Sequence, residues 1–184
     1  MSERRVMRLG LSGRCCAGKD SCAEVLGYHK LPLAGALKEE VVSGLVDIGL
    51  PLDLAYLEEH KSVFRGLLQT HGDVVRHFDP VHYVNIVRRR ALSLAARGIP
   101  VAVTDVRYPN EVEALEEAGF VIVRLEVSPL VQDTRYRARY GRSLTDAERL
   151  HQSETALDDY RFLYSVNADQ PLEDMVAAVR KIIS

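Results

Sequence analysis

The stretch VMRLGLSGRCCAGKDS, residues 6–21, decides the fold of this chain. It opens with an apolar run, Val6 to Leu11, of the kind that forms a buried strand. Residues 13–19 (GRCCAGK) then match the G-x-x-x-x-G-K core of a phosphate-binding loop, or P-loop. Asp20 to His29 has the pattern of a helix, and a position between a strand and a helix is what this motif requires. The sequence therefore predicts a strand, a P-loop and a helix in direct succession.

The composition of the loop follows from its chemistry. Glycines allow the backbone to turn tightly, so that its N–H groups point inward at phosphate oxygens. Lys19 ends the loop and reaches the β- and γ-phosphates of ATP as a mobile positive charge. We therefore predict that ATP is bound by the loop and the first helical turn: Gly13, Arg14, Cys15, Cys16, Ala17, Gly18, Lys19, Asp20 and Ser21.

Two acidic residues are candidates for a metal site. Residues 101–105 (VAVTD) form an apolar strand that ends at Asp105, and in P-loop proteins such an acid holds Mg²⁺ or its water. Asp20 follows Lys19, where the general motif has a Ser or Thr on the metal. Because carboxylate oxygens suit Mg²⁺, we predict that Asp20 and Asp105 bind the ion, directly or through water. The alternative for Asp20 is a residue that only begins the helix.

The rest of the chain alternates apolar strands with amphipathic helices. Alternation of this kind is typical of α/β proteins, in which a mostly parallel sheet lies between two layers of helices. We predict a three-layer P-loop NTPase fold, with a mostly parallel sheet flanked by helices. Further strands are expected at 31–35, 101–103, 120–127 and 162–166, and helices at 37–48, 54–69, 81–96, 110–118 and 172–183.

Several motifs give the chain a more specific resemblance. GKDS (18–21) together with DVRYPNEVEAL (105–115) resembles the phage-type deoxynucleoside monophosphate kinases. HQSETALDDY (151–160) is similar to a late segment of that family, and RGLLQTHGDVVRHFDPVHYVN (65–85) is similar to its substrate-side helix pair. The resemblance implies an enzyme that transfers the γ-phosphoryl group of ATP, with Mg²⁺, onto a nucleoside monophosphate. In that reading Glu154 belongs to a family motif without an assigned role.

The resemblance also implies how the chain is divided. A single domain, 1–184, would have its core at about 1–35, 98–128 and 150–184, an acceptor-binding insert at about 36–97 and a lid at about 129–149. An acceptor nucleotide needs cations for its phosphate, an amide for the base edge and an aromatic ring for stacking. The predicted acceptor-binding residues are Lys38, Arg65, Gln69, Arg76, Tyr83, Asp105, Arg107 and Glu111.

The predicted lid contains a group of arginines. Arg135, Arg139 and Arg142 recur at i, i+4 and i+7, so they share one face of a helix. Such a lid supplies positive charge to the transferring phosphoryl group. The alternative is a solvated basic helix, balanced by Asp133 and Glu148. The predicted catalytic residues are Lys19, Arg107 and Arg139, and the predicted further ATP contacts are Arg135 and Asn167.

Composition argues against several other classes of protein. Lys and Arg total 24 against 26 Asp and Glu, and a net charge of −2 is unlike that of a general nucleic-acid binder. No apolar run approaches the ~20 residues of a membrane span, and the N-terminus lacks the apolar core of a signal peptide. The three cysteines lie within residues 15–22 and are expected as reduced thiols. We expect a cytoplasmic protein (host cytoplasm if phage-encoded) without nucleic-acid or membrane partners. The sequence does not decide between a monomer and a homodimer.

Two other functions stay open from the sequence. One is a P-loop kinase of another small phosphorylated metabolite, such as dephospho-coenzyme A or phosphomevalonate. The other is a nucleotide-binding switch, which would carry a guanine-specifying N-K-x-D stretch. The chain has no such stretch, and its late asparagine candidate is Asn167-Ala168-Asp169. The base of the acceptor is not specified, because Tyr83 stands where the family commonly has Trp and this chain has no Trp.

Overall fold

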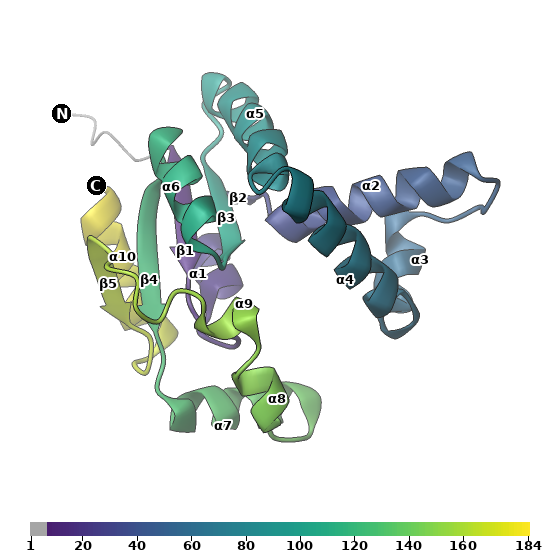
Figure 1. The fold of residues 1–184 in the computed structure, drawn as a ribbon. Coiled ribbons are helices and arrows are strands. Elements are labelled where there is room, and N and C mark those ends of the chain that lie inside the picture. The colour runs from purple at the N-terminus through teal and green to yellow at the C-terminus, as the bar shows by residue number, and fades with distance from the viewer. Residues whose placement is uncertain (1–6) are drawn as a thin grey trace.

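A five-stranded parallel sheet forms the centre of the molecule (Figure 1). In the computed structural model, which describes residues 7–184, the strand order is β2-β3-β1-β4-β5. All neighbouring strands in this order run parallel, so their carboxyl ends lie at one edge of the sheet. The strands are β1 (Arg8–Ser12), β2 (His29–Lys30), β3 (Val101–Val106), β4 (Val121–Glu126) and β5 (Tyr164–Asn167).

Helices cover both faces of the sheet, which confirms the predicted three-layer α/β fold. Side chains alternate between the faces along each strand. In β3, Val101 and Val103 belong to the core on one face, whereas Ala102 belongs to the core on the other. The first core is covered by α2, α5 and α6, and the second by α1 and α10. The helices are α1 (Lys19–Val25), α2 (Leu33–Asp47), α3 (Leu54–Glu59), α4 (Lys61–Phe78), α5 (His82–Ala96), α6 (Pro109–Glu117), α7 (Pro129–Tyr140), α8 (Asp146–Arg149), α9 (Gln152–Thr155) and α10 (Leu172–Ile183).

Two groups of helices lie outside these layers. Figure 1 shows α3 and α4 extending away from the sheet on one side, with α2 running out beside them. It also shows α7 and α8 beyond the arrowheads of β3 and β4, past the carboxyl ends of the strands. In open α/β sheets ligands bind at this edge, so the functional site is to be sought there.

The strand expected at 31–35 is a wrong prediction. The short strand β2 precedes that range, and α2 already begins at Leu33. The physical reason is a contact from a distant part of the chain: the carboxylate of Asp105 accepts hydrogen bonds from the backbone N–H groups of Leu33 and Ala34. These are donors that a helix start leaves without a partner inside the helix. Asp105 therefore stabilises a helix where the local sequence reads as a strand.

The helix expected at 54–69 is in fact two helices. α3 ends at Glu59, and α4 begins at Lys61 after His60, whose φ of −104° and ψ of 27° depart from helical values. α4 then continues to Phe78, beyond the predicted end. It stops at Asp79 because the following Pro80 disfavours the helical conformation in the residue before it.

The N-terminal expectations are only partly covered. Val6, predicted to begin the first strand, lies outside the described residues, and so does part of the N-terminal segment that is expected to lack the apolar core of a signal peptide. No helix within residues 7–184 is both long and apolar enough to cross a membrane.

Candidate active site

The loop between β1 and α1 has the backbone conformation of a P-loop. Gly13 and Gly18 have φ values of 147° and 92°, in the region that favours glycine. A Cβ atom at Gly13 would lie 2.6 Å from the backbone oxygen of Leu125, so a larger residue does not fit there. Cys16 also has a positive φ, 60°, which is uncommon for a residue with a side chain. The sequence prediction of a tight loop around residues 13–18 is therefore met by its geometry.

Lys19 is held against the loop. Its side chain is buried, and Nζ donates to the backbone oxygens of Gly13 at 2.5 Å and Arg14 at 2.9 Å. Burial, followed by the positive charge of Arg107, lowers the pKa of Lys19 to about 8. The lysine is thus a buried cation with few competing solvent contacts, which suits the binding of an anion.

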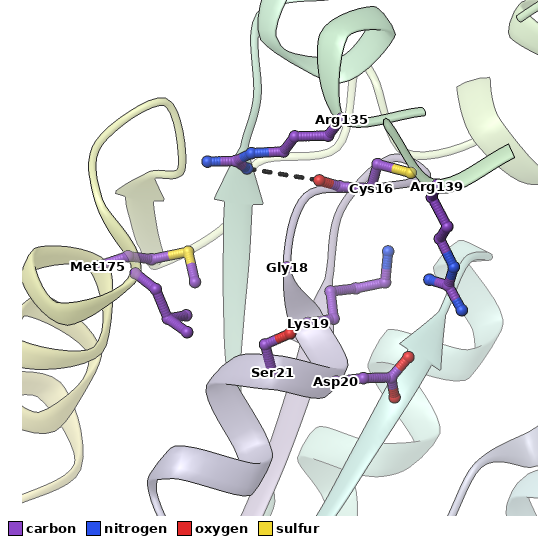
Figure 2. Close-up of a pocket in the computed structure, with 9 residues that line it drawn as sticks. Cys16, Gly18, Lys19, Asp20, Ser21, Arg135, Arg139 and Met175 are labelled. Atoms are coloured by element: carbon purple, nitrogen blue, oxygen red, sulfur yellow. Dashed lines mark hydrogen bonds between the residues drawn. The ribbon is translucent and has the colours of Figure 1, made fainter. Parts of the chain in front are cut away.

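A cavity of about 290 Å³ opens beside Lys19 (Figure 2). The side chain of Arg135 crosses its rim from α7 and donates to the backbone oxygens of Cys16 and Gln170, both at 3.4 Å. Figure 2 shows Arg139 extending from the same helix toward the space that Lys19 and Asp20 face. The lining residues are Cys16, Gly18, Lys19, Asp20, Ser21, Arg135, Arg139, Leu172 and Met175.

The three arginines predicted to share one face of the lid helix divide into two groups. Arg135 and Arg139 line the P-loop cavity. Arg142 does not share their helical face, because α7 ends at Tyr140 and Gly141 turns the chain with a φ of 72°. It forms two hydrogen bonds with Glu148, at 2.7 and 2.8 Å. The prediction of a shared face is therefore correct for Arg135 and Arg139 and wrong for Arg142. The charge of Arg142 is balanced by Glu148, as the alternative of a solvated basic helix predicts.

The two predicted metal-binding acids differ in their surroundings. Asp20 is exposed in the first turn of α1, and one of its oxygens accepts a hydrogen bond of 2.7 Å from Thr104 Oγ1. Asp20 lines the P-loop cavity together with Lys19 and Ser21, so its carboxylate fits a Mg²⁺ site there. One oxygen of Asp105 accepts from Leu33 N at 2.8 Å, and the other accepts from Ala34 N at 2.9 Å. Asp105 therefore caps α2, and we do not assign it to the metal.

A second, larger cavity of about 700 Å³ lies between the sheet edge and the α2–α4 arm. Its charged lining consists of five cations, Lys38, Lys61, Arg65, Arg76 and Arg107, and three acids, Asp73, Asp105 and Glu111. Burial raises the pKa of Glu111 to about 7, so this acid contributes less than a full negative charge at neutral pH, and burial raises the pKa of Asp105 as well. The cavity is therefore suited to an anionic molecule. Of the predicted acceptor-binding residues, it brings together Lys38, Arg65, Gln69, Arg76, Asp105, Arg107 and Glu111.

Tyr83 is placed elsewhere, and the prediction that it stacks on a base is corrected. The residue is 4% exposed and packs in the core of α2, α4 and α5. Its ring lies under the guanidinium of Arg76, 5.5 Å from the Cζ atom. Tyr83 does not line the cavity, but it packs against Arg76, which does. Tyr108, whose ring lies 5.9 Å from the same atom, is an aromatic residue that does.

Segment 105–111 (DVRYPNE) connects three parts of the fold. Asp105 caps α2, and Asn110 donates to the backbone oxygen of Pro80 in the turn between α4 and α5 at 2.7 Å. Glu111 accepts from the backbone N–H groups of Arg107 at 2.8 Å and Tyr108 at 3.1 Å, which fixes the start of α6. Pro109 occupies the first position of that helix, where its missing N–H costs nothing. Arg107 extends toward α9, where it pairs with Glu154.

The remaining predicted residues lie around the P-loop without lining either cavity. Arg14 forms an ion pair of 2.6 Å with Asp158. The side-chain oxygen of Asn167, at the end of β5, accepts from Asp169 N at 2.9 Å. Gly13, Cys15 and Ala17 form the interior of the loop, and the Cys15 and Cys16 sulfur atoms lie 3.6 Å apart as free thiols.

Besides Tyr108, sequence reasoning missed the contributions of Arg124 and Glu154 near the P-loop. Arg124 from β4 donates to Ser12 Oγ at 3.1 Å and joins Arg14 at Asp158. Glu154 was flagged only by the family motif, yet its carboxylate contacts the P-loop itself, at Cys15 N, at 2.6 Å. No local pattern around residue 154 distinguishes this contact from a solvated helix start.

The fold occurs in known kinases. The structure is similar to a gluconokinase from Sinorhizobium meliloti 1021, with a TM-score of 0.58 and 19% sequence identity over 97% of this chain and 92% of that one. It is also similar to dephospho-CoA kinase from Campylobacter jejuni, with a TM-score of 0.51 and 13% identity over 96% of this chain and 95% of that one. At these identities the likeness concerns the fold.

One comparison rests on sequence. The chain is 31% identical over 160 residues to the uncharacterized protein ORF77 of Ictalurid herpesvirus 1 (strain Auburn), which covers 83% of this chain and 60% of that protein. The chain thus spans about 60% of the length of this curated relative. No family model matches the chain.

Proposed function

We propose that the chain is a kinase that transfers the γ-phosphoryl group of ATP to a nucleoside monophosphate. The observation that carries this proposal is the position of Arg107. It lines the second cavity, its charge acts on Lys19 in the P-loop, and it pairs with Glu154, which contacts the loop at Cys15. Arg107 therefore links the second cavity to the P-loop through the charge that it exerts on Lys19 and through its pairing with Glu154, as a reaction between two phosphorylated molecules requires.

The P-loop cavity would take the ATP phosphates. Loop amides and Lys19 would bind the β- and γ-phosphates, while Arg135 and Arg139 would cover them from α7. In the transfer, an oxygen of the acceptor phosphate forms a bond to the γ-phosphorus as the bond to the β–γ bridging oxygen breaks, and ADP leaves. Charge spreads over the transferred group, so positioned cations are the main catalytic requirement. We therefore assign no dedicated general base.

Mg²⁺ bound to the phosphates would neutralise part of the charge that develops during transfer. Asp20 is the residue that fits it, because it lines the P-loop cavity and the hydrogen bond from Thr104 engages one of its two carboxylate oxygens. Ser21, the hydroxyl residue beside it, lines the same cavity.

The second cavity would hold the acceptor. Its volume of about 700 Å³ falls within the ~300–1,000 Å³ range of pockets that enclose small organic ligands. Arg76 and Arg107 would bind the acceptor phosphate as charge-assisted donors. Gln69 offers an amide to the edge of a base, and Tyr108 offers the aromatic surface that Tyr83 does not.

A coupled assay of ADP release tests the proposal. The purified chain is incubated with ATP and Mg²⁺ and with each ribo- and deoxynucleoside monophosphate in turn, while dephospho-coenzyme A, phosphomevalonate and gluconate serve as competing acceptors. We expect at least one nucleoside monophosphate to raise ADP release above the background ATPase rate. Stimulation by one of the other acceptors alone would replace the proposed substrate, and no stimulation by any of them would refute the transfer reaction.

A further inference from the structure

Glu154 occupies a position that the proposed reaction does not explain. It lies in α9, directly after the α7–α8 segment, and its side chain is only 9% exposed. The buried carboxylate points at the P-loop from a part of the chain 139 residues away. Burying a charge is costly unless partners compensate for it, so its partners indicate what it does.

The first partner belongs to the phosphate-binding loop. Cys15 N, a backbone donor in the middle of the P-loop, donates to one carboxylate oxygen at 2.6 Å. Backbone N–H groups of such a loop are the donors that bind phosphate oxygens. An oxygen of the Glu154 carboxylate therefore occupies a donor of the kind that binds phosphate.

The second partner is Arg107, which lines the second cavity. Arg107 forms an ion pair with the other carboxylate oxygen and also donates to the backbone oxygen of Ser153 at 3.1 Å. Burial first, with the charge of Glu154 among the further causes, raises the pKa of the Cys15 thiol to about 12. The negative charge of Glu154 thus acts on the loop as well as on Arg107.

A nucleotide phosphate and this carboxylate would compete for the same donor. Both are anions, and at hydrogen-bond distance from one N–H group they would repel each other strongly. We propose that Glu154 is an internal stand-in for a nucleotide phosphate, a positioning residue that holds Cys15 N and Arg107 until the phosphate displaces it. Displacement then frees Arg107 for the reacting phosphates. This inference rests on the proposed function, because it needs a nucleotide in the P-loop.

The variant Glu154→Gln tests the competition. It keeps the size of the side chain and removes the charge, so the loop donor and Arg107 lose their anionic partner. We expect the variant to bind ADP more tightly than the wild type, by roughly fivefold or more, since a charge-assisted contact becomes an ordinary one. It should also melt at a lower temperature without nucleotide, because the ion pair with Arg107 is lost. If Glu154 had a merely structural role, the substitution would lower both the affinity for ADP and the melting temperature.

Isothermal titration calorimetry with ADP and with inorganic pyrophosphate, together with thermal melting, measures these effects. Pyrophosphate should gain affinity by the same factor as ADP, which would place the effect at the phosphates. Glu39→Gln is the matched control, because it removes a carboxylate paired with Arg90 at 2.5 Å on the surface of α2. It should leave ADP affinity unchanged. ADP binding that is equal or weaker in Glu154→Gln than in the wild type would overturn the inference alone, whereas no ADP binding by either protein would overturn the proposed function and this inference together.

Discussion

Asp105 offers a test between a metal ligand and a helix cap. The sequence favours the first role, whereas the structure shows the carboxylate accepting from Leu33 N and Ala34 N. Asp105→Ala removes both acceptors. Leu33 is buried, so its N–H group would lose its partner without gaining water, at a cost of about 1–3 kcal/mol. Ala34 is exposed, and water would largely replace its partner.

The expected loss of stability is therefore about 2 kcal/mol, which also lies at the upper end of the ~0.5–2 kcal/mol range for a lost helix cap. For a chain of this length it corresponds to a fall in Tm of roughly 4–8 °C. Asp105→Asn should lose less. It keeps one acceptor, and it removes a carboxylate whose pKa is raised by burial, which means that its ionisation opposes folding.

Urea unfolding and thermal melting measure the stability, and kcat against Mg²⁺ concentration measures the metal requirement. Asp53→Ala is the control, because Asp53 caps α3 through a single exposed contact with Tyr56 N at 2.7 Å. It should cost ~1 kcal/mol or less. An Asp105→Ala protein with unchanged Tm and a raised Mg²⁺ requirement would refute the capping role and restore Asp105 to the metal.

Three further predictions concern the proposed reaction. Arg76→Ala should raise the acceptor KM roughly 10- to 100-fold, with little change in the ATP KM, because one charge-assisted contact is lost; equal KM values in wild type and variant would remove Arg76 from the acceptor site. Asp20→Ala should raise the Mg²⁺ concentration needed for half-maximal kcat, while Asp20→Ser restores a hydroxyl ligand and keeps partial activity; normal turnover of Asp20→Ala at low Mg²⁺ would leave Asp20 only as a helix-start residue. ADP affinity should fall by up to about tenfold between pH 7.5 and 9, because Lys19, with a pKa of about 8, is charged below that pH and neutral above it; calorimetry should show this slope in the wild type and not in Lys19→Met, and a flat wild-type profile would contradict the lowered pKa.

The parts of the molecule that sequence reasoning predicted are those set by local pattern. The P-loop needs glycine at positions of positive φ, and the short motif at residues 13–19 has a glycine at such positions. The alternation of apolar strands with amphipathic helices likewise follows from neighbouring residues, which is why the three-layer parallel fold could be predicted. The charged residues of segment 65–76 could be placed near the acceptor cavity because the family motif covers them.

Several of the errors arise where a distant residue decides the outcome. Leu33 begins a helix because Asp105, 72 positions later, accepts from its N–H group, and nothing in LPLAG indicates this. The motif predicts that Tyr83 is an exposed aromatic residue, but its side chain is buried in the core formed by α2, α4 and α5. Glu154 lies 139 residues from its partner Cys15. Contacts of this kind are visible only once the chain is folded.

Segment 105–111 has a consequence for how related chains are to be interpreted. Asp105, Pro109, Asn110 and Glu111 start two helices and anchor the turn before α5, so four of its seven residues serve the architecture. Selection for folding alone would preserve them, even in a descendant that no longer turned over any substrate. Retention of DVRYPNE in a related chain therefore indicates common descent and a shared fold, and it does not indicate activity. Evidence for chemistry in such a descendant has to come from the side chains that the scaffold does not need, and Arg139 at the open face of the P-loop cavity is the most informative of these.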